Sequence, residues 1–495
     1  NNRPPFIAGN NLNFPYPFYL QRVAMLTVFD GNESGGSISR RRLLEIGGLG
    51  LGGLSLSQLL NTKALASGQP NPLTGKSVIF LFQQGGPSQF ETFDPKPYAP
   101  SGIRTVGDVV STSIPGVQFG ASMSQLAKLA HKFNVVRSFA TQNAGHNIQP
   151  IVSSFSKEAA ISAHFARIAG ATRLDSGMPT TAVLFPASVN KDVPGPSARG
   201  NLSETGNYGA GFAPFVPGKG GKLQEDMKLN LPRDRFLNDR KSLLAELDKL
   251  NRKADASGSI AAADDTQQQA YEVLLGGGVS KALDLSQEDA RTLEMYDTSR
   301  YDGGTKWNKV NRGKAGMYNA QANTIGKLLL QARRLCEAGC GYVTIHASYA
   351  GVWDMHADRN NLDMTDGMEA VGQSFDHAVA AFIRDCEQRG LSEKILLVCC
   401  GEMGRTPRIN KNGGRDHWSR LAPLMLYGGG LGGGKVIGQS DKQGGEPNST
   451  PYNPGHLIST ILRTMIDPGE LRLLSGIPQE ITQLLDHDPI GGLGT

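Results

Sequence analysis

Short apolar runs alternate with helical patterns along most of the chain. Six runs are apolar enough to form buried strands, at residues 77–82, 134–138, 180–185, 341–346, 394–400 and 423–427. Apolar residues recur at helical spacing in residues 315–338 and 372–389. Strands that alternate with helices favour a mostly parallel sheet covered by helices on both faces. We therefore predict an α/β fold built on one central sheet.

The pattern changes over residues 219–300. Residues 232–253 form a charged helical segment, and residues 254–266 form a connection of small and polar residues. Ser286 to Asp289 has the composition of a helix start. We interpret this region as a helical insertion in a single domain that spans residues 67–495.

Residues 39–66 have the three regions of a signal peptide: a basic cluster at Arg40–Arg42, a glycine-rich apolar segment, and small residues at Ala64 and Ala66. Ser39-Arg40-Arg41 followed by two leucines resembles a twin-arginine export signal. The apolar part is shorter than the roughly 20 residues that a membrane span needs. We expect residues 1–66 to be a tail plus signal peptide, and the rest to be periplasmic or secreted without a transmembrane span. Residues 1–38 fit either a long leader, a misassigned start or a retained tail.

Composition excludes several classes of protein. The net charge of +5, with 19% charged and 39% hydrophobic residues, is ordinary for a globular protein. Basic residues are not clustered with aromatic ones after residue 70, so a nucleic-acid partner is not expected. Five cysteines between residues 336 and 400 do not form a disulfide framework. Cys336 and Cys340 leave a disulfide or a zinc pair open, whereas Cys399 and Cys400 fit the buried core.

Carboxylate and imidazole groups follow the later strands. The site of an open α/β sheet lies beyond the carboxyl ends of its strands. Asp354 and His356 follow the fourth strand, Glu402 follows the fifth, and Asp416 and His417 are adjacent in a glycine-flanked loop. We predict these five residues as ligands of a divalent metal. Oxygen and imidazole ligands favour zinc, with manganese, iron or calcium as alternatives.

Each of these groups also has a structural explanation. Asp354 could cap a turn, the pair at 416–417 could be a surface loop, and Glu402 could form a salt bridge with Arg405. His146 lies in a polar loop after the second strand, where it could act as a ligand or a proton donor. Ser88 follows Gly-Gly-Pro and is either a nucleophile or a helix cap. The candidate catalytic residues are therefore Ser88, His146, Glu402 and Arg405.

Motifs in a fixed order carry a family resemblance. They are Gly-Gly-Pro-Ser at 85–88, Thr-Phe-Asp-Pro-Lys-Pro at 92–97, Arg-Ser at 137–138, Trp-Asp-Met-His at 353–356, Gly-Glu-Met-Gly-Arg-Thr-Pro at 401–407 and Gly-Arg-Asp-His-Trp at 414–418. Over residues 40–490 the chain resembles an uncharacterised, sulfatase-like family of twin-arginine-exported bacterial proteins in the alkaline phosphatase superfamily. The resemblance implies an alkaline phosphatase-like fold and hydrolysis of phosphate or sulfate esters at a site that usually holds two metals.

The chain departs from that superfamily at several positions. Gln83-Gln84-Gly85 stands where an aspartate usually follows the first strand, and Glu402 stands where sulfatases have an aspartate followed by a histidine. Neither Cys-x-Pro-x-Arg nor Ser-x-Pro-x-Arg occurs, so formylglycine chemistry is not expected. These differences leave a single metal or a rearranged site open.

The sequence thus supports two functions. The first is a metal-assisted hydrolase of small-molecule or polysaccharide esters, in which the metal activates a water or the Ser88 hydroxyl. Arg405 or Arg415 would then neutralise the anionic group of the substrate. The alternative is a non-catalytic protein with an eroded site that binds polysaccharide or a protein partner. The oligomeric state is open.

Overall fold

The computed structural model describes residues 70–173, 175–195, 197–218, 278–346 and 349–494. All of them belong to one compact unit, residues 53–495. The predicted tail and signal peptide at residues 1–66 and the predicted helix at residues 232–253 lie outside the described residues, so both stay predictions.

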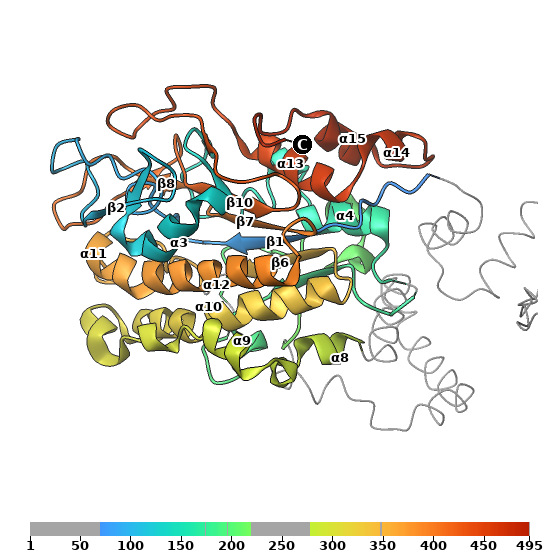
Figure 1. Ribbon diagram of the computed structural model, residues 1–495, viewed down its shortest axis with the longest axis horizontal. Helices are drawn as coiled ribbons and strands as arrows, with labels where there is room; N and C mark the ends of the chain where they lie inside the picture. Colours follow the sequence, from blue (N-terminus) through green and yellow to red (C-terminus); the bar gives the residue numbers. More distant parts are fainter. Residues whose placement is uncertain (1–69, 174, 196, 219–277, 347–348, 495) are drawn as a thin grey trace, which may run out of the picture. The chain divides into compact units, whose positions relative to one another are not determined.

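A seven-stranded sheet forms the centre and confirms the predicted α/β fold (Figure 1). The strand order is β11-β4-β10-β7-β1-β6-β5. The strands are β1 (Ser77–Phe82), β4 (Phe133–Val136), β5 (Thr181–Leu184), β6 (Tyr342–His346), β7 (Ile395–Cys400), β10 (Leu424–Gly428) and β11 (Val436–Ile437). Strand β10 is antiparallel to both of its neighbours, whereas the other pairs are parallel. The six predicted strands all belong to this sheet, in which the two-residue β11 was missed, and the short strands of two further two-stranded sheets were not predicted either.

Strand β1 lies in the middle of the sheet and is buried on both faces. Ile79 and Leu81 belong to one hydrophobic core, and Val78 and Phe80 belong to the other. Successive side chains of a strand point to opposite faces, so a strand between two cores has to be apolar throughout. This requirement explains why the run was recognisable in the sequence.

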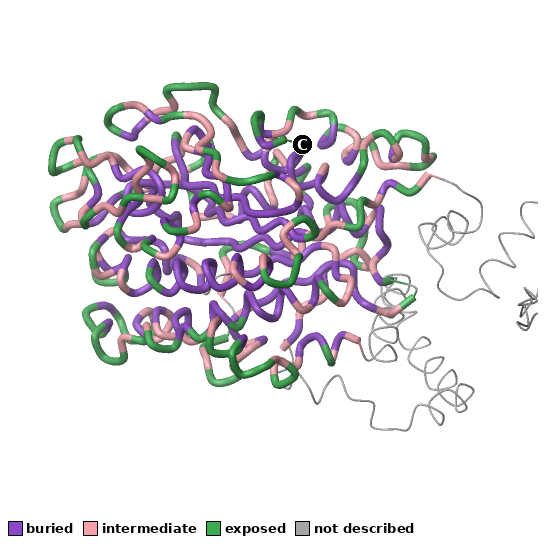
Figure 2. Tube along the Cα trace, viewed as in Figure 1, coloured by how far each residue is buried: buried purple, intermediate pink, exposed green. Residues whose placement is uncertain are grey.

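Helices cover both faces of the sheet (Figure 1). One face carries α3 (Ser124–Leu129), α8 (Gly278–Leu283), α9 (Ala290–Met295), α10 (Arg312–Glu337), α11 (Met364–Gly367) and α12 (Gln373–Arg389). The other carries α4 (Ile161–Ala169), α13 (Pro454–Met465), α14 (Pro468–Arg472) and α15 (Gln479–Asp486). Figure 2 shows that burial is concentrated in the sheet and in the helix faces that contact it. Among the described helices, none has the length and hydrophobicity to cross a membrane.

The described part of the predicted insertion contains α8 and α9, which pack on the side of α10. Helix α9 begins after Asp289, whose carboxylate accepts a hydrogen bond from the Thr292 backbone N–H, so the helix start predicted there is confirmed. The Tyr296 hydroxyl donates to Asp385 Oδ2 at 2.9 Å, and Arg333 lies 3.0 Å from the same oxygen. These buried polar contacts attach the end of α9 to α10 and α12.

All five cysteines are free and buried. Cys399 and Cys400 lie in strand β7, where they contribute to the two cores, as predicted. Cys336 and Cys340 therefore do not form the disulfide that the sequence left open.

Helix α10 contains two glycines that allow a matched test of its packing. A methyl group at Gly326 would lie 1.8 Å from the Tyr296 carbonyl oxygen, whereas one at Gly316 would meet nothing within 4 Å. Gly326→Ala should therefore lower the free energy of unfolding by about 1–3 kcal/mol through overpacking. Gly316→Ala should raise it by up to about 1 kcal/mol through helix propensity. Urea unfolding of both variants checks this, and a Gly326→Ala variant as stable as the parent would contradict the packing.

Candidate metal centre

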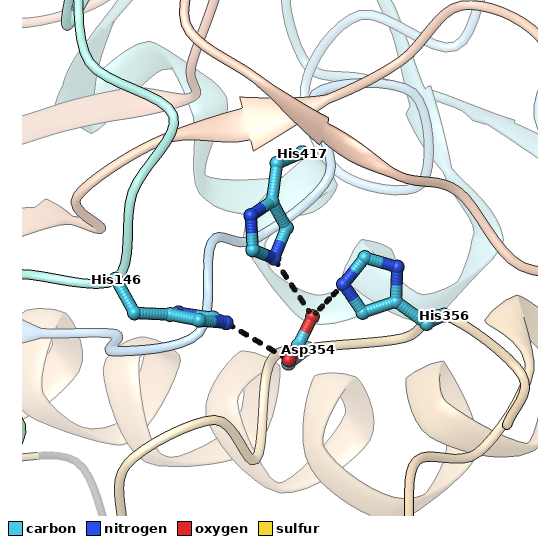
Figure 3. A group of neighbouring side chains, drawn as sticks. All are labelled: His146, Asp354, His356 and His417. Atoms are coloured by element: carbon cyan, nitrogen blue, oxygen red, sulfur yellow. Dashed lines mark hydrogen bonds and ion pairs between the residues drawn. The ribbon is translucent and has the colours of Figure 1, made fainter.

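Four side chains converge beyond one edge of the sheet. His146 lies in the loop after β4, Asp354 and His356 lie in the loop after β6, and His417 lies in β9 (His417–Trp418), between β7 and β10. Strands β4, β7, β1 and β6 run in the same direction, so their carboxyl ends share this edge. One ligand atom from each residue lies within 4.8 Å of the others, as in a metal site (Figure 3). We call these four residues the metal-site group.

Asp354 lies at the centre of the group (Figure 3). Its Oδ2 is 3.0 Å from His146 Nε2, and its Oδ1 is 2.8 Å from His356 Nε2 and 3.4 Å from His417 Nε2. Arg405 Nη2 donates to the same Oδ1 at 2.9 Å. Burial alone would raise the pKa of Asp354, but the histidine hydrogen bonds and the Arg405 charge hold it well below its usual range. Asp354 therefore remains a carboxylate.

His417 differs from the other two histidines. Its Nε2 atom is buried and makes no hydrogen bond within the described part of the chain, although it lies within ion-pair distance of Asp354. Its ring packs 4.4 Å from the His146 ring and 4.6 Å from the His356 ring, centroid to centroid. A buried imidazole nitrogen without a hydrogen bond, directed at a carboxylate, is the arrangement that a shared cation would complete.

Two further carboxylates orient the histidines from behind. His146 Nδ1 lies 3.0 Å from Glu402 Oε1, and His356 Nδ1 lies 3.1 Å from Asp416 Oδ1. Both Glu402 oxygens also accept the Gly85 backbone N–H, at 2.9 and 3.0 Å. Metal-binding histidines typically use their second nitrogen in this way, which fixes the ring and its tautomer.

These contacts also set the proton affinity of the imidazoles. Burial lowers the pKa of His146, but hydrogen bonds to Asp354 and Glu402 outweigh it and raise the pKa above its ordinary value. For His356, the hydrogen bond to Asp354 is the largest effect, and it raises the pKa despite burial. Both rings therefore hold a proton more tightly than a free histidine does.

The structure thus brings together three of the five predicted ligands, Asp354, His356 and His417, with His146, for which the sequence left a role as ligand or as proton donor open. Glu402 and Asp416 contact the histidines rather than pointing into the group. The sequence shows that both acids follow strands, but not which nitrogen of a neighbouring ring each one contacts.

Arg405 links the loops that build the site. It lies in β8 (Gly404–Arg405), which pairs with β9 so that Arg405 is opposite His417. The fully buried guanidinium donates to the Gly86 carbonyl at 2.7 Å, to the Gly85 carbonyl, and to the Trp353 carbonyl at 3.2 Å. Arg405 therefore fixes the turn after β1 and the loop after β6 as well as the Asp354 carboxylate.

Ser88 lies apart from these contacts. Its hydroxyl donates to Glu91 and accepts the Phe90 backbone N–H at 3.2 Å. Glu91 is in turn 3.1 Å from Arg415. The serine thus belongs to a buried turn, and its role as a nucleophile stays a prediction.

Two residues of the first turn hold the site, and the sequence pointed to neither role. Gly85 has φ +125°, and a Cβ there would lie 2.8 Å from the Asp354 backbone nitrogen. Only glycine allows this approach. The Gln84 side chain donates to the Asn147 carbonyl at 2.7 Å and so holds the loop that carries His146. The sequence feature that could have indicated this role of Gln84 is a polar residue close after the first strand.

Comparison with known proteins identifies the family. The profile of a family described as "Protein of unknown function (DUF1501)" matches residues 75–491. The chain belongs to the DUF1501 family. None of the curated proteins matches it.

Several solved structures are weakly similar to this DUF1501 chain. PsFucS1 sulfatase from Pseudoalteromonas sp. has 12% identity and a TM-score of 0.31, covering 83% of this chain and 70% of that one. Ps i-CgsB has 9% identity and a TM-score of 0.31, covering 84% and 77%. A mutant of TAB5 alkaline phosphatase with Mg bound in the M3 site has 13% identity and a TM-score of 0.27, covering 80% and 99%.

Zinc binding by this DUF1501 chain should depend on pH. A metal binds neutral imidazole, so the protons that His146 and His356 hold above the ordinary histidine pKa must be displaced. The apparent affinity should therefore rise with pH through and above about 6.5, by up to roughly tenfold per unit for each displaced proton. Isothermal titration calorimetry in buffers of different ionisation enthalpy measures the affinity for zinc and the number of protons released on binding. An affinity that is constant over this range, with no proton release, would contradict the assignment.

Proposed function

We propose that this protein is an exported, metal-dependent hydrolase of phosphate or sulfate esters, acting on a small molecule or a polysaccharide. The observation that carries the proposal is the convergence of three imidazoles on the buried Asp354 carboxylate, with the His417 Nε2 atom lacking a hydrogen bond in the described structure. Export is supported by the sequence pattern of residues 39–66, which fits delivery to the periplasm or beyond the cell.

The donor set fits a divalent cation. Three imidazole nitrogens and one carboxylate oxygen are the ligands that zinc prefers, and manganese or iron accepts them as well. Asp354, His146, His356 and His417 would hold the metal. When bound, it would polarise an ester oxygen and lower the pKa of an attacking water.

The surrounding residues define how a substrate would reach the centre. The side chains of His356 and His417 are 24% and 26% exposed, compared with 12% for His146 and 6% for Asp354. An ester would therefore approach over His356 and His417, whereas Glu402 and Arg405 support the centre from the buried side. Glu402 keeps the His146 ring in place, and Arg405 keeps Asp354 charged and fixed.

One observation favours a second function. Four protein ligands are also what a structural zinc site has, because catalytic sites usually keep a position open. A protein that uses its metal to hold four loops together could bind polysaccharide or a protein partner without catalysis.

Graded substitutions test the metal centre. His417→Ala should weaken zinc binding by at least about 100-fold because it removes a ligand. Glu402→Gln should weaken it by about 10–100-fold, because only the orientation of His146 is affected. His131→Ala is the control, since His131 is exposed and contacts Ser113. Competition against a fluorescent zinc chelator measures all three.

The same proteins separate the two functions. The zinc-loaded protein should hydrolyse p-nitrophenyl phosphate or p-nitrophenyl sulfate, and His417→Ala should lose that activity while His131→Ala keeps it. Tight zinc binding without turnover of any phosphate or sulfate ester would favour the binding protein. A protein that binds no divalent metal would exclude the proposed hydrolase.

A further inference from the structure

Two basic side chains lie beside the metal-site group, at Gly351. A Cβ placed on Gly351 would lie 3.1 Å from Lys314 Nζ, 3.8 Å from an Arg199 guanidinium nitrogen and 3.6 Å from the Asp354 Cβ. Lys314 comes from the first turn of α10, and Arg199 comes from the segment after β5. Two cations distant in sequence thus both approach Gly351, close to Asp354.

Neither cation forms an ion pair with a carboxylate of the described residues, although the charges of Asp354 and Asp358 act on Lys314 from further away. Lys314 Nζ donates to the carbonyls of Gly351 and Ala350. The backbone of Arg199 contacts Gln84, but its guanidinium has no hydrogen bond within the residues that the structure describes. Across those same residues, no carboxylate lies within 4.0 Å of the charged end of either side chain.

This arrangement has an electrostatic cost in the absence of an anion. Lys314 is half-buried, and burial together with the nearby Arg199 charge lowers its pKa to about 8, against the opposing effect of Asp354. The positive end of the α10 helix dipole adds to the same potential. An anion between the two side chains would relieve the repulsion and replace the lost hydration.

The arginines that the sequence suggested for this role are engaged elsewhere. The guanidinium of Arg405 is fully buried and bonded to backbone carbonyls and Asp354. The guanidinium of Arg415 is also fully buried, between Glu91 and the carbonyls of Pro407 and Ile103. A substrate anion would have to displace these contacts to reach either one. Arg199 is exposed, so a substrate can reach it without such a rearrangement.

We propose that Lys314 and Arg199 form the anion-binding part of the site and bind the tetrahedral oxyanion of the substrate, a phosphoryl or sulfuryl group, beside the metal centre. Gly351 contributes because a side chain there would crowd the Lys314 ammonium group. This inference rests on the proposed function and specifies the charge of its substrate.

Titration with inorganic phosphate and, separately, inorganic sulfate tests the proposal. Calorimetry on the full chain, both zinc-loaded and metal-free, should show binding that weakens at least about tenfold in Lys314→Gln and in Arg199→Gln, the effect of losing one charge-assisted hydrogen bond. Lys327→Gln is the matched control, since Lys327 is an exposed lysine on the same helix, and it should bind the anions as the parent does.

The outcomes separate this inference from the proposed function. Zinc affinity should be unchanged in Lys314→Gln and Arg199→Gln, because neither residue is a ligand. An affinity for the anions within twofold of the parent in both variants, or no anion binding by the parent, would overturn the inference. Zinc binding by the parent would in that case still support the metal centre. Arg199 is on the surface, so its variant remains informative if Lys314→Gln fails to fold. If the parent protein did not bind zinc, the proposed function would instead be refuted. Titration of the metal-free protein with phosphate and sulfate would still test the role of Lys314 and Arg199.

Discussion

A buried carboxylate surrounded by positive partners holds the site together. An isolated charge in the interior of a protein is very costly, so Asp354 can stay ionised only because Arg405 and the imidazoles contact it. Arg405 is held by the backbone carbonyls of the turn after β1. That turn can approach the backbone of Asp354 only because Gly85 has no side chain. The charge of one side chain thus determines the positions of several loops. A divalent cation would be bound by the same side chains, with the imidazole nitrogens holding the metal in place of protons.

The sheet explains why residues so distant in sequence meet. Parallel strands place their carboxyl ends at one edge, so every loop that follows such a strand contributes to the same space. Strand β10 is antiparallel to both β4 and β7, so β4 and β7 run in the same direction. The loop after β4, which carries His146, therefore lies at that edge. The short pairing of β8 with β9 then brings His417 next to Arg405.

Much of this was predictable from the sequence, and the limits have physical causes. The apolar run of β1 is legible because burial on both faces requires it, whereas the two residues of β11 carry no pattern. The strand ends identified Asp354, His356 and His417, since their positions follow from topology. The sequence could not decide between the ligand and proton-donor roles of His146, nor show that Glu402 contacts its ring, because both depend on ring nitrogens and on the Gly85 N–H. Lys314 gave no signal at all, because its neighbour Arg199 is distant in sequence.

The most direct test of the account is X-ray absorption spectroscopy of the zinc-loaded protein. Coordination by the metal-site group predicts a first shell of nitrogen and oxygen at about 2.0–2.1 Å with the outer-shell scattering of about three imidazoles. The five free cysteines are buried in the hydrophobic cores, and none belongs to the metal-site group, so no sulfur should be present. A sulfur shell at about 2.3 Å, or a spectrum without imidazole scattering, would contradict the convergence of these side chains on one cation.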